Sequence, residues 1–228
     1  MKPRLPPRSR RSWAAETAEG VRHLWRHTGL RSLVVAGGCA MTASSLSSTA
    51  TYALLDIGLH RPAAFAGVLG SVQALGSVVS GLTAGALLRR VPVRALSVAG
   101  LTLFALGALA RTTGSVPVVL GGSLLVGLGL PWPLIGAMTT VQKETPGELL
   151  GRVAATASTL VFAPTGLALL AGTAMVAVLD HRVQLLAAGA VALGAAALLA
   201  ATGRTRAAPP AGPGPDRPPR EAGAAEKG

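Results

Sequence analysis

Long apolar runs follow one another along this chain with only short polar turns between them. Half of the 228 residues are hydrophobic, 13% are charged and the mean hydropathy is +0.51. A helix needs about 20 residues to cross the hydrocarbon of a bilayer. Six runs meet or approach that length: Ser32 to Asp56, Phe65 to Leu88, Ala95 to Ala110, Val116 to Met138, Val153 to Leu179 and Val183 to Ala201. We therefore predict an all-α integral membrane protein with six transmembrane helices, in which consecutive helices are antiparallel neighbours.

The basic residues predict the orientation of these helices. Among the 21 Lys and Arg residues, only Arg61, Arg111 and Arg182 fall in the turns opposite the termini. Because Lys and Arg concentrate on the cytoplasmic side, we expect a multi-pass protein of the cell membrane with both termini in the cytoplasm. The third run is the shortest and gains length if Arg94 and Arg111 extend outward. The net charge of +12 is not accompanied by aromatic residues interleaved in a basic groove, so we expect no nucleic-acid partner.

Composition divides the chain into three parts. Residues 1–31 form a basic cytoplasmic lead-in, in which Ser12 to Thr28 has the spacing of an amphipathic helix on the membrane surface or of a solvated linker helix. Residues 32–203 are the transmembrane domain. Residues 204–228 form a cytoplasmic tail rich in Pro, Gly and Ala, which we expect to be disordered.

The turn between the second and third runs combines glycines with arginines. Gly81 and Gly85 are four residues apart, a spacing that leaves a groove for the backbone of a neighbouring helix. Three arginines follow, where such helices would leave the lipid: Arg89, Arg90 and Arg94. The stretch predicts the inner turn of a membrane hairpin.

Prolines interrupt the fourth and fifth runs. Pro131 and Pro133 each remove one helical hydrogen bond and disfavour helical geometry at the preceding residue. The fourth helix must therefore bend or break, and such interruptions often act as hinges or line cavities. Trp132 lies between these prolines and offers a stacking surface for a flat apolar substrate. Pro164 predicts a second kink near the middle of the fifth run.

Polar side chains inside the runs are the candidates for a substrate pathway. Four lie on one face of the first helix: Thr42, Ser45, Thr49 and Tyr52. This face could be the wall of a water-filled cavity. Alternatively it is a packing face, since small hydroxyls can bond the carbonyls of their own helix. Gln73 is the only amide well inside a predicted span, and a buried amide needs partners. Gln73 is therefore a candidate for contact with a substrate.

The order of these features resembles the C-terminal half of a major facilitator superfamily transporter, helices seven to twelve, in the bacterial drug, macrolide and siderophore exporter branch. WAAETAEGVRHLWRHTGLRSL is similar to the linker and start of the seventh helix, and LLDIGLHRPAAFAGVLGSVQALGSVVSGLTAGALLRR to the eighth. ETPGELLGRV is similar to the turn between helices ten and eleven, through four residues: Thr145, Pro146, Gly151 and Arg152. The resemblance implies a half-bundle of two three-helix inverted repeats.

The arginine turn resembles the superfamily's inner-turn motif, G-x-L-a-D-R-x-G-R-K, only in part. Four residues occupy matching positions: Gly85, Leu87, Arg90 and Arg94. Arg89 stands where the family prefers Asp, Pro92 where it prefers Gly, and Val93 where it prefers a basic residue. The charge pairing through which the family's Asp locks its gate cannot form here in the same way. The arginines then act either in gating or only as determinants of topology.

The resemblance implies membrane transport, with efflux of a small amphipathic molecule such as a drug, a macrolide or a siderophore. The superfamily's substrate site lies between two six-helix halves, so we expect this chain to need a complementary N-terminal half or a second copy. The alternative is a membrane protein without transport activity, either an accessory or regulatory protein or an inactive truncated relic. We predict no enzymatic activity, catalytic residue, metal site or cofactor, since no nucleophile with a base and no nucleotide motif is present.

Overall fold

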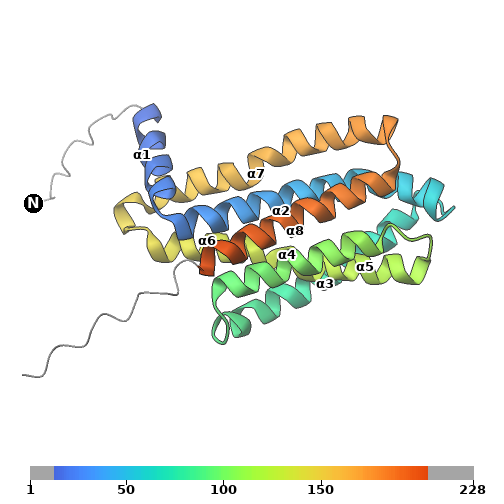
Figure 1. Ribbon diagram of the computed structural model, residues 1–228, viewed down its shortest axis with the longest axis horizontal. Helices are drawn as coiled ribbons and strands as arrows, with labels where there is room; N and C mark the ends of the chain where they lie inside the picture. Colours follow the sequence, from blue (N-terminus) through green and yellow to red (C-terminus); the bar gives the residue numbers. More distant parts are fainter. Residues whose placement is uncertain (1–12, 205–228) are drawn as a thin grey trace, which may run out of the picture.

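The computed structural model describes residues 13–204, which form helices without any strand in that range (Figure 1). Residues 1–12 and the predicted disordered tail after Arg204 lie outside the described part of the chain. The elements are α1 (Trp13–Arg26), α2 (Thr28–Ala53), the π-helix η1 (Leu54–Gly58), α3 (Phe65–Leu88), α4 (Val93–Ala110), α5 (Val116–Gly129), α6 (Pro131–Glu144), α7 (Gly147–Val178) and α8 (His181–Arg204).

The described chain contains six helical segments long and apolar enough to cross a membrane, as predicted. They are Thr28–Gly58, Phe65–Leu88, Val93–Ala110, Val116–Glu144, Gly147–Val178 and His181–Thr202. Several run beyond the predicted limits, because a helix continues into the polar residues beside its apolar run. The fold is that of an all-α, multi-pass membrane protein.

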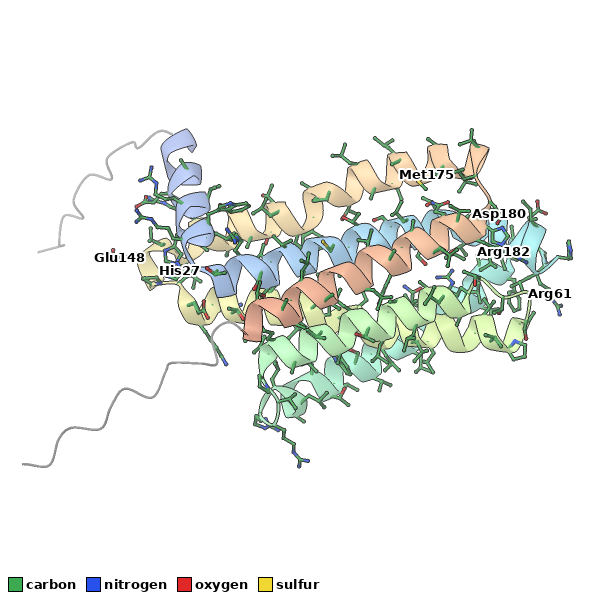
Figure 2. The ribbon with its side chains drawn as sticks, in the orientation of Figure 1. His27, Arg61, Glu148, Met175, Asp180 and Arg182 are labelled. Atoms are coloured by element: carbon green, nitrogen blue, oxygen red, sulfur yellow. The ribbon has the colours of Figure 1, made fainter. Side chains whose placement is uncertain are left out.

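Both ends of the described chain lie at the same end of the bundle (Figure 1). There, α1 lies across the bundle, and we call this end the α1 end; the opposite end, which holds η1, is the η1 end. Figure 2 shows His27 and Glu148 at the α1 end and Arg61, Asp180 and Arg182 at the η1 end. An amphipathic helix was predicted for α1, and a helix is present there.

The helices pack as two related sets of three. The first helix of the first set, α2, packs against α7 and α8 of the second set. The first helix of the second set, α5 with α6, packs in the same way against α3 and α4. Since two spans, α3 and α4, lie between α2 and α5, these two run in opposite directions. This is the packing that two inverted three-helix repeats would produce.

The expectation that consecutive helices are packing neighbours is wrong for most pairs. Only α4 and α5 pack extensively among consecutive spans, whereas α3 packs chiefly on α5 rather than on α2. A short turn fixes the direction of the next helix, but the small residues on each helix decide which helix it packs against.

Glycines bring particular helices into backbone contact. A Cβ added to Gly107 of α4 would lie 2.5 Å from the carbonyl oxygen of Gly122 on α5, and one added to Gly100 would lie 2.6 Å from that of Gly129. On α3, a Cβ added to Gly76 would lie 2.6 Å from the carbonyl oxygen of Leu124. These positions accept no larger residue without a shift of the backbone.

The groove predicted at Gly81 and Gly85 is not used by any described helix. A Cβ added to either glycine would meet no atom within 4 Å. The buried stripe of α3 includes Ser80 and Ala84, and a side chain one position further along lies about 100° around the helix. Gly81 and Gly85 therefore lie on the exposed side of α3.

Candidate functional site

Three clefts meet at Tyr52, near the η1 end of α2. One of about 400 Å³ lies between α2 and α3, and one of about 350 Å³ lies between α2 and α7. The third, of about 490 Å³, is lined by Tyr52 together with Asp56 and Arg61. The Tyr52 side chain is 63% exposed. The open face of α2 and the adjoining sides of α3 and α7 therefore form a hollowed surface near this end.

The cleft between α2 and α3 exists because α3 packs on α5. Its lining contains two of the predicted pathway residues, Tyr52 and Gln73, with Ser48 and Ser77 nearby. Arg111, which follows α4, also lines it. Ser77 donates a hydrogen bond to the Gly127 carbonyl at 3.2 Å and so ties this part of α3 to α5.

Arg111 does not extend outward, so that part of the prediction is wrong. Its side chain is 3% exposed and turns back toward α2. Nη1 donates to the Ser47 hydroxyl at 3.1 Å, and Nη2 donates to the Thr51 hydroxyl at 2.7 Å. The arginine stem lies against α5, where a Cβ added to Gly122 would come within 3.1 Å of its Cγ.

The sequence contained a signal for this arrangement that was missed. Ser47 and Thr51 are four residues apart and share one face of α2. Gly122 removes the side chain that would otherwise occupy the path of the Arg111 stem. A hydroxyl pair facing a glycine can hold an arginine at the edge of a membrane span, but which helices face one another was not evident from hydropathy.

Most hydroxyls on α2 bond the backbone of their own helix. Thr42 donates to the Gly38 carbonyl at 2.9 Å, and Ser45 donates to the Met41 carbonyl at 3.0 Å. This geometry favours the packing alternative for these two residues. Thr49, which donates to the Leu46 carbonyl at 2.9 Å, also lines the cleft between α2 and α7.

Gln73 is not the only amide inside the membrane domain. Gln184 on α8 is fully buried, and its Nε2 donates to the carbonyls of Leu46 and Gly172, both at 3.1 Å, and to the Thr49 hydroxyl. The predicted sixth run began at Val183, which put Gln184 at its margin. In the structure α8 begins at His181, and Gln184 in its first turn lies against Leu46 and Thr49 of α2.

The arginine turn contributes one side chain to a cleft at the α1 end. Arg94 donates through Nη2 to the Ser32 hydroxyl at 2.8 Å, and lines a cleft of about 340 Å³ with Lys143 and Glu144 of α6. Arg89 and Arg90 are exposed on the turn itself. Of the three arginines in this turn, Arg94 therefore contacts another helix of the bundle, whereas Arg89 and Arg90 are exposed.

The proline pair bends the fourth span without unwinding it. The assigned helix is interrupted at Leu130, whose backbone keeps helical angles, φ −63° and ψ −41°. Pro133 is buried, and Trp132 is half-buried with its Cβ near Gly100 of α4. By contrast, α7 continues as one assigned helix through Pro164.

The turn before α7 connects to α1. Thr145 is extended, as expected for a residue before Pro146, and α7 begins at Gly147. Arg152 forms an ion pair of 2.8 Å with Glu19 of α1. Nearby, a Cβ added to Gly20 would lie 2.7 Å from the Thr156 hydroxyl oxygen, so α1 and α7 are close at this point. Gly151 has open space instead.

Comparison with known proteins gives a family. A search of curated proteins and a search of solved structures each returned no match. The family model of the Major Facilitator Superfamily matches residues 33–226, which is most of the chain and includes all but the start of the first span. The chain therefore belongs to the Major Facilitator Superfamily.

Proposed function

We propose that this chain is one six-helix half of a major facilitator exporter, which moves a small amphipathic molecule such as a drug, a macrolide or a siderophore out of the cell. The observation that carries the proposal is the meeting of three clefts at Tyr52, on an open face of a membrane helix. An aromatic side chain flanked by hydroxyls, an amide and apolar walls suits an amphipathic molecule.

The open side of these clefts is the reason for proposing a partner. Other helices of this chain cover little of α3 and α7. In the apolar 18-residue segment of each, only 17% is buried. Large apolar side chains such as Leu82, Leu170 and Val178 are at least 72% exposed. Lipid covers part of this surface. A complementary N-terminal half, or a second copy of this chain, would cover the rest and close the clefts into a pathway.

Outward transport follows from the exporter branch that the sequence resembles. The charge distribution supports cytoplasmic termini, which would place the α1 end in the cytoplasm and the Tyr52 clefts toward the outer side. No Asp or Glu lies well inside the six spans of this chain. If a proton drives export, the complementary half supplies the carboxylate that carries it.

The test is export by cells that express the chain alone, together with a matched N-terminal half, or not at all. We expect ethidium or a macrolide to accumulate less only when both halves are present, or with the chain alone if two copies pair. Tyr52→Ala should weaken this export, because it removes the side chain that the three clefts share. Equal accumulation in all cells, with the chain correctly inserted, would refute the proposal and favour an accessory protein or a relic.

A further inference from the structure

Arg111 is a buried cation that has no carboxylate partner among the side chains that the structure describes, residues 18–202. Among these side chains, Glu19 pairs with Arg152, and the Asp180 carboxylate lies 3.2 Å from His181 Nδ1. Arg111 has only the hydroxyls of Ser47 and Thr51, and its buried Nε has no hydrogen-bond partner among the described residues. A buried charge is costly unless an opposite charge balances it. An anion in the adjoining cleft would supply that balance.

The cleft that Arg111 lines has room for that anion and offers further donors. It measures about 400 Å³ and also contains the Gln73 amide and the Tyr52 hydroxyl. Neither of these groups forms a hydrogen bond with the described residues. A guanidinium, an amide and a phenol all donate to oxyanions. The three donor residues therefore line the same cleft.

Apolar side chains form part of the cleft wall. Ala66, Leu69 and Ala74 of α3 line it opposite the hydroxyls of α2. Asp56, an acidic residue on η1, lines the neighbouring cleft together with Arg61 rather than this one. The cleft thus combines a positive, donor-rich region with hydrocarbon walls.

We propose that the cleft between α2 and α3 binds an amphipathic ligand by its oxyanion, a carboxylate or a phosphate, through Arg111 with Gln73 and Tyr52. Arg111 is held in place by Ser47, Thr51 and the space at Gly122, so the guanidinium is preorganised. The inference deepens the proposed transport function by assigning the charge of one substrate class. The oxyanion belongs either to a soluble amphiphile or to a lipid headgroup, because the cleft lies near the η1 end of the bundle.

A binding measurement on the full chain tests this proposal. The chain is purified into phosphatidylcholine nanodiscs and titrated with dansyl-labelled undecanoate and with its neutral methyl ester, and empty nanodiscs give the background. We expect saturable binding of the acid that is tighter than that of the ester. Arg111→Gln should weaken binding of the acid by about tenfold to hundredfold and leave the ester unchanged. Arg182→Gln, at an exposed arginine of the same end, should change neither.

Two further variants keep the test decisive if Arg111→Gln fails to fold. Gln73→Leu and Tyr52→Phe remove groups that form no hydrogen bond with the described residues, so both variants should fold. Each should weaken binding of the acid several-fold. Equal binding of acid and ester, or full binding by these two variants, would overturn the proposal. Phosphatidylglycerol in the nanodiscs distinguishes the sources: competition that requires Arg111 assigns the oxyanion to a lipid headgroup, and its absence assigns it to a soluble amphiphile.

The outcomes are separable from those of the export experiment. If the chain binds the acid through Arg111 but exports nothing with a complementary half, the proposed binding site is supported and the proposed transport function is refuted. If export does not depend on Arg111 and the acid binds no more tightly than the ester, the transport function is supported and the proposed binding site is refuted.

Discussion

The interface between α4 and α5 and the cleft between α2 and α3 are opposite results of helix packing in one bundle. At the first, Gly100, Gly107, Gly122 and Gly129 bring two backbones so close that added Cβ atoms would clash with carbonyl oxygens. At the second, α3 packs on α5 instead of α2 and leaves a cleft of about 400 Å³. Both pairs are consecutive helices joined by short turns.

The difference shows what selects a neighbour inside a membrane. Lipid and helix are equally apolar, so close packing and polar ties decide which helices associate. Glycines close the interface between α4 and α5. Side chains with volume and hydrogen-bonding groups, such as Tyr52 and Gln73, line the cleft between α2 and α3. We therefore expect substitutions at the glycine interface to change stability, and substitutions in the cleft to change binding and transport.

The largest effect is expected when a side chain is forced into the glycine interface. Gly107→Leu must separate α4 from α5, which should lower the free energy of unfolding by about 3 kcal/mol. Titration of the purified protein with sodium dodecyl sulfate, followed by circular dichroism, measures this change. Gly121→Leu on α5 is the matched control, because a Cβ there meets no atom within 4 Å. Similar losses in both variants would contradict the assigned interface.

An intermediate effect on the free energy of unfolding is expected at one of two glutamines. Gln184 donates to the carbonyls of both Leu46 and Gly172 at 3.1 Å, whereas Gln73 lines the cleft without such bonds to the described residues. Gln184→Leu should lower the free energy of unfolding by about 1 to 2 kcal/mol, and Gln73→Leu by less than about 0.5 kcal/mol. In the same detergent titration, a larger loss for Gln73→Leu would reverse the roles assigned to the two amides.

The smallest effect is expected where α1 meets α7, a contact that combines a glycine with an ion pair. The Glu19 and Arg152 side chains are 39% and 31% exposed, so Glu19→Gln should cost at most about 1 kcal/mol. Hydrogen exchange should become faster in α1 and remain unchanged in α4. Glu148→Gln, at an exposed carboxylate in the first turn of α7, is the control. Gly20→Val should loosen α1 more than Glu19→Gln, since it introduces a clash with Thr156 and the Arg152 backbone.

The number of spans and the interruption beside the proline pair could be predicted because they depend on local properties. Hydropathy over about 20 residues identifies a span, and a proline removes a helical hydrogen bond wherever it lies. The interruption at Leu130 followed from this local chemistry. Its prediction required no knowledge of neighbouring helices.

Lateral packing could not be predicted in the same way, and the errors share this cause. Gly81 and Gly76 have the same local chemistry, yet only Gly76 meets the backbone of α5. Arg111 follows a span as an outward-extending arginine would, but Ser47, Thr51 and Gly122 give it an inward path. Each outcome depends on a residue from another helix, so one helix read alone cannot supply it.

Thiol labelling tests most directly whether the cleft between α2 and α3, rather than the glycine interface, is open to ligand. In a Cys39→Ala background, which removes the single native cysteine, Gln73→Cys reports on the cleft and Ser123→Cys, on the fully buried side of α5, reports on the packed interior. We expect a membrane-impermeant maleimide to label Gln73→Cys about tenfold faster, and dansyl-labelled undecanoate to slow that reaction alone. Equal labelling of the two positions, or faster labelling at Ser123→Cys, would contradict the account.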